Sequence, residues 1–276
     1  MMWKRTAMRS FRILLIGGMV LFTAACGAFT LDEALNHPYG FQPTIPPWKS
    51  QTQSYYLDEL PNLFFNETTF NKLIVVGISE QHGPCSGAAE NDLSAARIIF
   101  EGLEFMHPEE SLSFEDFCAT DMEYFNCTQN DVVGHQDFEK LIIIGGPEVN
   151  LGWFYYNFHK SLAICFSRDG ILVQPTGNVY RGSGYWGREG IMGTQGIGPS
   201  RSVTDYAIIE LYNDEGRPVL LVAGLSGIST KIACVYLLET LVSGGTLPHK
   251  SGIVLRISWE AGRPLPSDYQ IVEVVA

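Results

Sequence analysis

The segment that constrains the fold most is residues 218–240, PVLLVAGLSGISTKIACVYLLET. Its first part, Val219 to Ala223, is a continuous apolar run, which is typical of a strand covered on both faces. The glycines that follow permit a sharp turn. Ser229 or Thr230 can then cap a helix, because a hydroxyl oxygen accepts the free N–H groups of its first turn. The remaining residues are apolar over most of a helix surface, so the segment predicts a buried strand, a tight turn and a packed helix.

Two earlier segments show the same pattern of a buried strand followed by a polar or glycine-rich loop. Residues 73–78 form an apolar run. Residues 88–105 after it predict a helix with one apolar face, made by Ala89, Leu93, Ala96, Phe100 and Leu103. Residues 141–144 form a second run that ends in a Gly-Gly-Pro turn, and Asn150 is a candidate cap for the segment beyond it. Repeated strand–loop–helix units predict parallel strands with helices on both faces of the sheet.

Later segments predict antiparallel strands. Residues 205–210 and 219–223 are separated by a short polar, glycine-containing turn and indicate a hairpin. Residues 252–259 and 269–275 alternate fairly well between polar and apolar side chains, which favours strands at the edge of the sheet. We therefore expect an α/β fold with a Rossmann-like, mostly parallel sheet, helices on both faces and antiparallel C-terminal edge strands.

The N-terminus has the pattern of an export signal. Residues 1–25 carry four basic side chains and no acidic one. The apolar stretch that follows the basic residues is shorter than the ~20 residues that span a bilayer, which favours a signal peptide over a transmembrane helix. The stretch Phe22-Thr23-Ala24-Ala25-Cys26-Gly27 resembles a bacterial lipoprotein box with Cys26 as the acylated residue, although Leu is usual where Thr23 stands. Cleavage without lipidation and an uncleaved anchor are the alternatives.

The rest of the chain divides into a linker and one domain. Residues 26–60 are rich in proline and polar residues and predict a tether from the membrane. Residues 61–276 are long enough for a single α/β domain with its own core. The alternative for the later part of the tether is an arm lying on the domain surface, which Trp48, Tyr55 and Tyr56 favour.

The charge of the chain disfavours nucleic acid as a partner. The full chain has 18 basic and 30 acidic residues and a net charge of −12. Removal of residues 1–25 takes away four basic residues and no acidic one, so the net charge falls to −16. A chain this acidic repels a phosphate backbone.

Five cysteines remain after Cys26. In an exported protein we expect a disulfide between Cys118 and Cys127, because this pair closes the shortest loop. Cys165 and Cys234 lie in apolar runs and are expected to be buried thiols. The spacings fit no zinc pattern, so we expect no metal site.

The residues just beyond the predicted strands are the candidates for a ligand site, because ligands of open α/β sheets bind outside the carboxyl ends of the strands. Glycines ahead of a helix N-terminus suit a phosphate or carboxylate group, although the charge of the chain opposes an anion. The alternative is that the glycines serve only the turns. The candidate ligand-binding residues are Gly145, Gly146, Asn150, Gly224, Ser226, Gly227, Ser229 and Thr230.

No catalytic set can be assembled from the sequence, and no cofactor can be named. Residues 224–228 contain the serine of a nucleophile elbow, Ser226, but Ile228 stands where the second glycine should be. His82 follows the first predicted strand, yet no spacing joins it or His159 to Ser226. An exported hydrolase or transferase that uses the region around Gly145 and Ser226 is kept as the alternative function.

The stretch from Ile144 to Asn150, IGGPEVN, resembles a strand-Gly-Gly-Pro-x-x-Asn signature of archaeal S-layer-associated proteins and related exported proteins. In that family a segment similar to residues 205–210 precedes one similar to Val222-Ala223-Gly224, with a threonine, here Thr230, opening the next helix. The resemblance extends in order over residues 73–276. It implies a Rossmann-like domain in an envelope protein and assigns no activity.

These observations lead to one expectation about function. We expect an exported, membrane-anchored lipoprotein of the cell envelope, held to the membrane through Cys26, with a Rossmann-like binding or structural domain. Its expected partner is a small anionic ligand or another envelope protein.

Overall fold

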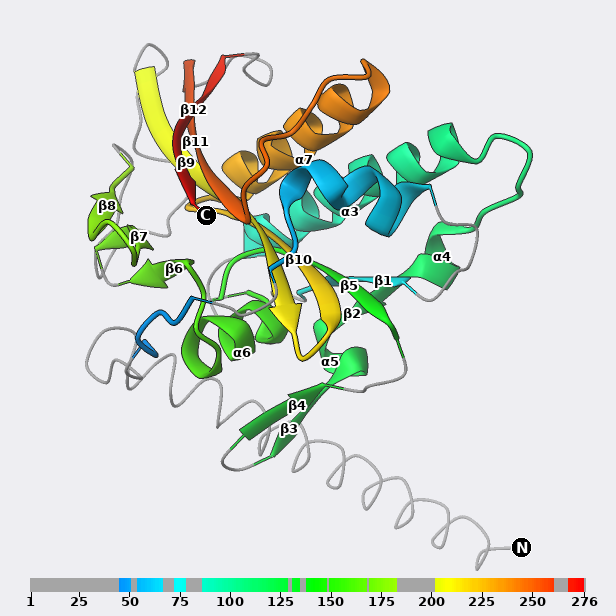
Figure 1. Cartoon of the computed structure of the whole chain (residues 1–276). Coiled ribbons are helices and arrows are strands. Elements are labelled where there is room, and N and C mark those ends of the chain that lie inside the picture. Colours follow the sequence, from blue (N-terminus) through cyan, green and yellow to red (C-terminus); the bar gives the residue numbers. More distant parts are fainter. Residues whose placement is uncertain are drawn as a thin grey trace, which may run out of the picture.

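The computed structural model describes residues 45–50, 54–66, 72–77, 86–128, 131–134, 138–147, 149–167, 169–182, 202–260 and 268–275. Its centre is a seven-stranded sheet with the order β12-β11-β9-β10-β5-β1-β2 (Figure 1). The strands are β1 (Lys72–Val76), β2 (Cys118–Thr120), β5 (Lys140–Ile144), β9 (Ser202–Asp214), β10 (Arg217–Gly224), β11 (Gly252–Glu260) and β12 (Tyr269–Val275). The protein is therefore a mixed α/β fold, as the sequence predicts.

The sheet divides into a parallel half and an antiparallel half. Strands β2, β1, β5 and β10 pair in parallel, whereas β9, β11 and β12 are joined to β10 and to one another by antiparallel pairing. The expectation of a mostly parallel sheet is too strong, because the long strand β9 lies inside the sheet rather than at its edge. The two C-terminal strands do form an antiparallel edge, as predicted.

Helices cover both faces of the sheet. Helices α3 (Ser86–Met106) and α7 (Gly227–Val242) pack against each other on one face, while α5 (Asp121–Tyr124) and α6 (Leu151–His159) lie on the other (Figure 1). Alternate residues of each strand enter the two cores: Ile142 and Ile144 face α3 and α7, whereas Leu141 and Ile143 face α6. This two-sided burial explains why the parallel strands read as continuous apolar runs.

Smaller elements complete the α6 side. Strands β3 (Phe125–Thr128) and β4 (Asp131–Gly134) form a hairpin, and β6 (Ile164–Ser167), β7 (Gly170–Val173) and β8 (Asn178–Tyr180) form a second, antiparallel sheet. Buried Glu210 of β9 accepts hydrogen bonds from the backbone N–H groups of Ala163 (2.9 Å) and Ile164 (3.0 Å) and so joins the two sheets. The short helix α4 (Phe114–Phe117) leads into β2.

The later part of the expected tether belongs to the folded domain. The backbone N–H of Trp48 donates to the Gln174 side chain at 2.9 Å. Leu57 and Leu60 are completely buried, in and beside the short helix η1 (Leu57–Glu59), which precedes η2 (Pro61–Phe65). The apolar side chains of Leu57 and Leu60 are thus part of the core next to α3, as in the alternative of an arm that packs on the domain.

Two further expectations concern the cysteines and the membrane. Cys118 is a free thiol in β2, so the expected disulfide with Cys127 is not formed. Its pairing partner is the parallel strand β1, which places it in the main sheet rather than in a surface loop. Cys165 and Cys234 are buried free thiols, as predicted. Within the described ranges, no helix is both long and apolar enough to cross a membrane. Residues 1–44, which include Cys26, lie outside these ranges.

Candidate functional site

The predicted glycine turns come together at the carboxyl ends of β1, β5 and β10. The N–H of Gly145 donates to the carbonyl of Val222 in β10 at 3.0 Å. A Cβ at Gly146 would lie 3.8 Å from the carbonyl oxygen of Gly224. Gly77, directly after β1, approaches the same turn so closely that a Cβ would lie 1.6 Å from the carbonyl oxygen of Val149. Three strand ends therefore converge at one place, as the sequence predicts for an open parallel sheet.

Asn150 is the N-cap of α6. Its side-chain oxygen accepts from the N–H groups of Gly152 (2.8 Å) and Trp153 (3.4 Å). Its side-chain nitrogen donates to the carbonyl oxygens of Val75 (3.1 Å) and Ile144 (2.8 Å). The predicted cap is confirmed, but the amide is fully occupied in tying α6 to β1 and β5.

The N-cap of α7 is Ser226 rather than Ser229 or Thr230. The Ser226 hydroxyl accepts from the N–H of Ser229 at 3.3 Å, and the Ser229 hydroxyl accepts from the N–H of Ser226 at 3.0 Å. Both hydroxyls donate to Asp205 Oδ2, at 2.6 Å from Ser226 and 2.9 Å from Ser229. The N-terminus of α7 is thus capped by serine hydroxyls, and a carboxylate from β9 accepts hydrogen bonds from both of these hydroxyls.

Asp205 is 5% exposed, and burial raises its pKa above the ordinary value. Three hydrogen bonds oppose this rise, from the two serine hydroxyls and from the N–H of Tyr206 at 2.9 Å. The sequence analysis did not select Asp205, because its position beside Ser226 depends on the antiparallel pairing of β9 with β10.

Ser226 does not have the geometry of a nucleophile. Its backbone is extended, with φ −135° and ψ 162°, whereas the serine of a nucleophile elbow sits on a strained turn. Its hydroxyl proton points to Asp205, and its hydroxyl oxygen caps the helix. The side chain therefore holds the turn together.

Gly224 and Thr230 are likewise explained by the turn. The N–H of Gly224 donates to the Thr230 hydroxyl at 2.9 Å, and this hydroxyl donates to the carbonyl of Ser226 at 3.2 Å. A Cβ at Gly224 would lie 2.1 Å from the Ser229 hydroxyl oxygen, so only glycine fits there. Gly227 is the half-buried first residue of α7.

Asp92 of α3 lies beside these residues and was missed by the sequence analysis. It is 1% exposed, and neither carboxyl oxygen has a well-formed hydrogen bond to another described residue. A Cβ at Gly145, whose φ is +106°, would lie 2.4 Å from Asp92 Oδ2. Burial raises the pKa of Asp92 to about 7, and the nearby Thr230 hydroxyl opposes this only in part.

The apolar spacing of residues 88–105 predicts a buried face that includes Leu93 and leaves out Asp92. In the structure Leu93 is 41% exposed, while Asp92 lies on the buried stripe with Ala96, Ile99 and Leu103. The available signal was a single carboxylate at the start of an otherwise apolar stripe with the spacing of a helix.

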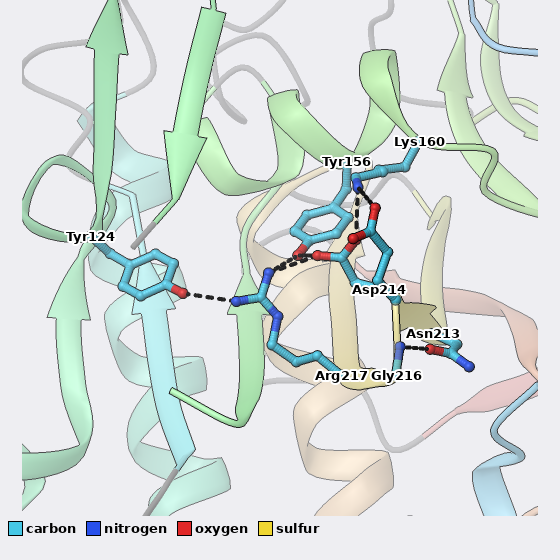
Figure 2. Close-up of polar contacts among 8 residues, drawn as sticks. Tyr124, Tyr156, Lys160, Asn213, Asp214, Gly216 and Arg217 are labelled. Atoms are coloured by element: carbon cyan, nitrogen blue, oxygen red, sulfur yellow. Dashed lines mark hydrogen bonds and ion pairs between the residues drawn. The ribbon is translucent and has the colours of Figure 1, made fainter. Parts of the chain in front are cut away.

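A second polar cluster lies at the opposite end of β10 (Figure 2). Asp214 forms ion pairs with Lys160 (2.8 Å) and Arg217 (2.7 Å) and accepts a hydrogen bond from the Tyr156 hydroxyl at 2.9 Å. Arg217 also donates to the hydroxyls of Tyr124 and Tyr156, each at 3.3 Å. The Lys160 and Arg217 hydrogen bonds hold the pKa of Asp214 below its ordinary value despite burial.

The structure thus places the predicted residues in and just after the turns that follow β5 and β10, and the side-chain polar atoms of Asn150, Ser226, Ser229 and Thr230 already have partners in the chain. His82 lies outside the described residues. Among the residues that the structure describes, no group of three or more His, Cys, Asp and Glu side chains could hold a metal ion.

Comparison with known proteins adds no family to this picture. No family model matches the chain, and a search of curated proteins finds no match.

Proposed function

We propose that this chain is an exported, lipid-anchored protein of the cell envelope. Its Rossmann-like domain binds a small ligand where the carboxyl ends of β1, β5 and β10 meet. The export part of the proposal is supported by the basic and apolar pattern of residues 1–25 and by the small residues before Cys26. The net charge of −16 after residue 25 disfavours nucleic acid as the ligand.

The ligand part is supported by the reversal of strand order between β1 and β5. The chain runs from β1 through α3 to β2 on one side, and then returns to β5 on the other side of β1. Ligands of open α/β sheets bind at such a reversal, outside the carboxyl ends of the strands. The Gly145–Gly146 turn and the Gly224 turn both lie there.

A hydrolase or transferase is less well supported, because Ser226 serves as a helix cap and its hydroxyl is bonded to Asp205. A serine-reactive phosphonate provides the check. Labelling of Ser226 by this probe would favour a hydrolase or transferase over a binding domain.

The anchor is tested with Cys26→Ser. We expect the wild-type chain to incorporate labelled palmitate and to fractionate with the membrane, and the variant to lose both properties. Unchanged labelling of the variant would contradict lipidation at Cys26.

The site is tested by thermal shift of the full chain in detergent against nucleotides, sugar phosphates, amino acids, amines and simple anions. A ligand stabilises the fold by ~2.7 kcal/mol at a hundredfold excess over its Kd. Gly146→Val fills the space between the two turns, since a Cβ there meets only the Gly224 carbonyl at 3.8 Å. Thr246→Val, in an exposed loop, is the control.

We expect Gly146→Val to abolish a saturable shift and Thr246→Val to keep it. A ligand that binds both variants equally well binds elsewhere, which would remove the strand ends from the proposal. A substitution at Gly224 is unsuitable, because its clash with Ser229 would disturb the turn itself.

A further inference from the structure

The Asp92 carboxyl has no charged partner and no well-formed hydrogen bond among the described residues. Among the described residues, the only buried side-chain atoms without a hydrogen-bond partner are its two oxygens and the indole nitrogen of Trp153. An unpaired buried carboxylate costs several kcal/mol relative to one in water. The other buried carboxylates near the sheet ends are bonded: Asp205 to two hydroxyls, and Asp214 to Lys160 and Arg217.

The carboxyl lies at the meeting point of three elements. It extends from the second turn of α3 to Gly145 at the end of β5, where it occupies the space that a side chain at position 145 would fill. It also lies near Thr230 and Cys234 on α7. The turn that covers it reaches the surface at the next two residues, Gly146 and Pro147, which are partly exposed.

Among the described residues, the donors around Asp92 are bonded to other groups, and only the Thr230 hydroxyl also lowers the pKa of this carboxyl. The Thr230 hydroxyl donates to the Ser226 carbonyl. The Asn150 amide donates to the carbonyls of β1 and β5, and the hydroxyls of Ser226 and Ser229 donate to Asp205. A bound molecule that pairs with Asp92 must therefore bring its own donor.

The partial positive charge at the N-terminus of α7 does not supply the missing partner. At this N-terminus, Asp205 already accepts hydrogen bonds from the hydroxyls of Ser226 and Ser229. A metal ion fits poorly as well, because a hard cation takes six or more oxygen ligands, and the described residues form no acidic cluster. An ammonium group, in contrast, needs few partners and donates three hydrogen bonds.

We propose that Asp92 binds the ammonium group of a small amine next to the Gly145–Gly146 turn, at the carboxyl ends of β5 and β10. This inference rests on the proposed ligand site and names the chemical class of its ligand. The net charge of −16 attracts a cation to the protein. A charge-assisted hydrogen bond to a buried carboxylate gives the site selectivity for the charged nitrogen.

The test is equilibrium binding to the full chain in non-ionic detergent at 150 mM salt. The probe is 1,5-diaminopentane, and 1,5-pentanediol is its neutral counterpart. We expect the wild-type protein to bind the diamine at least a hundredfold more tightly than the diol. Equal affinities would overturn the inference without the use of any variant.

The matched variants are Asp92→Asn and Glu101→Gln. Both remove one negative charge from α3, but Glu101 is exposed. We expect Asp92→Asn to weaken diamine binding ten- to a hundredfold and Glu101→Gln to change it less than twofold. An equal loss in both variants would reveal a general charge effect and would overturn the inference.

Inorganic phosphate and glutarate distinguish this inference from the proposed site. If an anion binds, Gly146→Val abolishes its binding and the diamine does not bind, the ammonium inference is wrong while the site stands. If no compound of the wider thermal-shift screen binds either, both are rejected.

Discussion

The buried carboxyl groups near the two ends of β10 differ in whether cationic side chains balance their charge. At the amino end, Asp214 is held by Lys160, Arg217 and a tyrosine hydroxyl, so its charge is balanced within the chain. At the carboxyl end, Asp205 is bonded only to neutral groups, and Asp92, which lies beside the Thr230 hydroxyl, has no charged partner among the described residues. The pKa of Asp214 is accordingly lowered, while those of Asp92 and Asp205 are raised.

This difference separates a structural cluster from a candidate site. A buried ion pair with well-placed partners is a closed unit, and removing one member leaves the others unpaired. A buried carboxyl without a partner lowers stability, and strongly perturbed carboxyls are concentrated at functional sites. The amino end therefore holds the β9–β10 hairpin to α6, and the carboxyl end is where we propose that a ligand binds.

The largest effect on stability is expected from breaking the ion pairs of Asp214 at the amino end of β10. Asp214→Ala should lower the free energy of unfolding by about 3–5 kcal/mol, because Lys160 and Arg217 lose their common partner. Urea unfolding measures this change. The control is Asp169→Asn, whose ion pair with Arg181 at 3.7 Å joins two side chains that are each 65% exposed, and which should change stability by less than about 0.5 kcal/mol. Similar losses in both variants would contradict the comparison.

The next largest effect is the dependence of stability on pH that Asp92 causes at the carboxyl end of β10. Asp92 has a pKa raised from 3.8 to about 7, so its contribution to stability is fully present below pH 3.8 and is lost as the pH rises through 7. The loss is on the order of 4 kcal/mol at pH 8. Asp92→Asn should therefore make stability depend less on pH between 4 and 8.

Glu210 also contributes to the dependence of stability on pH in that experiment. Burial raises its pKa to about 7 as well, and the variant retains it. The fall in stability should shrink in Asp92→Asn without disappearing. An unchanged pH profile would mean that Asp92 has a partner and is not open.

A smaller effect is expected at the turn that covers Asp92. Gly145→Ala should destabilise the protein by about 2 kcal/mol, because φ is +106° and the new Cβ meets the carboxyl. Gly146→Ala, in the same turn, should cost less than about 1 kcal/mol, since its Cβ meets only one atom, at 3.8 Å. Thermal unfolding of the pair measures the difference. Equal losses would place Asp92 away from Gly145.

The smallest effect concerns the helix cap. Ser226→Ala removes the α7 cap and one bond to Asp205, and it should cost about 1 kcal/mol. Ser243→Ala, at the C-terminal end of the same helix, serves as the control. No loss of stability in Ser226→Ala would contradict the assignment of this serine as a cap and would reopen the question of a nucleophile.

The strand–turn–helix units could be predicted because each is encoded locally. The runs around Ile142 and Leu220 are apolar on both sides, and glycines mark their ends. The residues of the candidate ligand site could be selected for the same reason, since they follow the strands directly in sequence. Their partners were not, because Asp92 and Asp205 come from elements more than 20 residues away in sequence.

Other features could not be predicted, because the local composition favours a different structure from the one that the tertiary contacts produce. The proline-rich arm around Trp48 has the composition of a tether but docks on Gln174. Cys118 lies in an acidic segment without a strand pattern, and only its long-range pairing with β1 makes β2 a strand. Such three-residue strands are fixed by tertiary contacts rather than by local preference.

The most direct test of the difference between the two ends is a carboxyl titration by ¹³C NMR of the full chain with labelled aspartate. Asp92→Asn and Asp214→Asn assign the two signals. The account predicts a midpoint near 7 for Asp92 and a value below 3.8 for Asp214. It also predicts that saturating 1,5-diaminopentane lowers the Asp92 midpoint and leaves Asp214 unchanged. An Asp92 midpoint near 4 without ligand would contradict the account, because the carboxyl would then already have its partner within the protein.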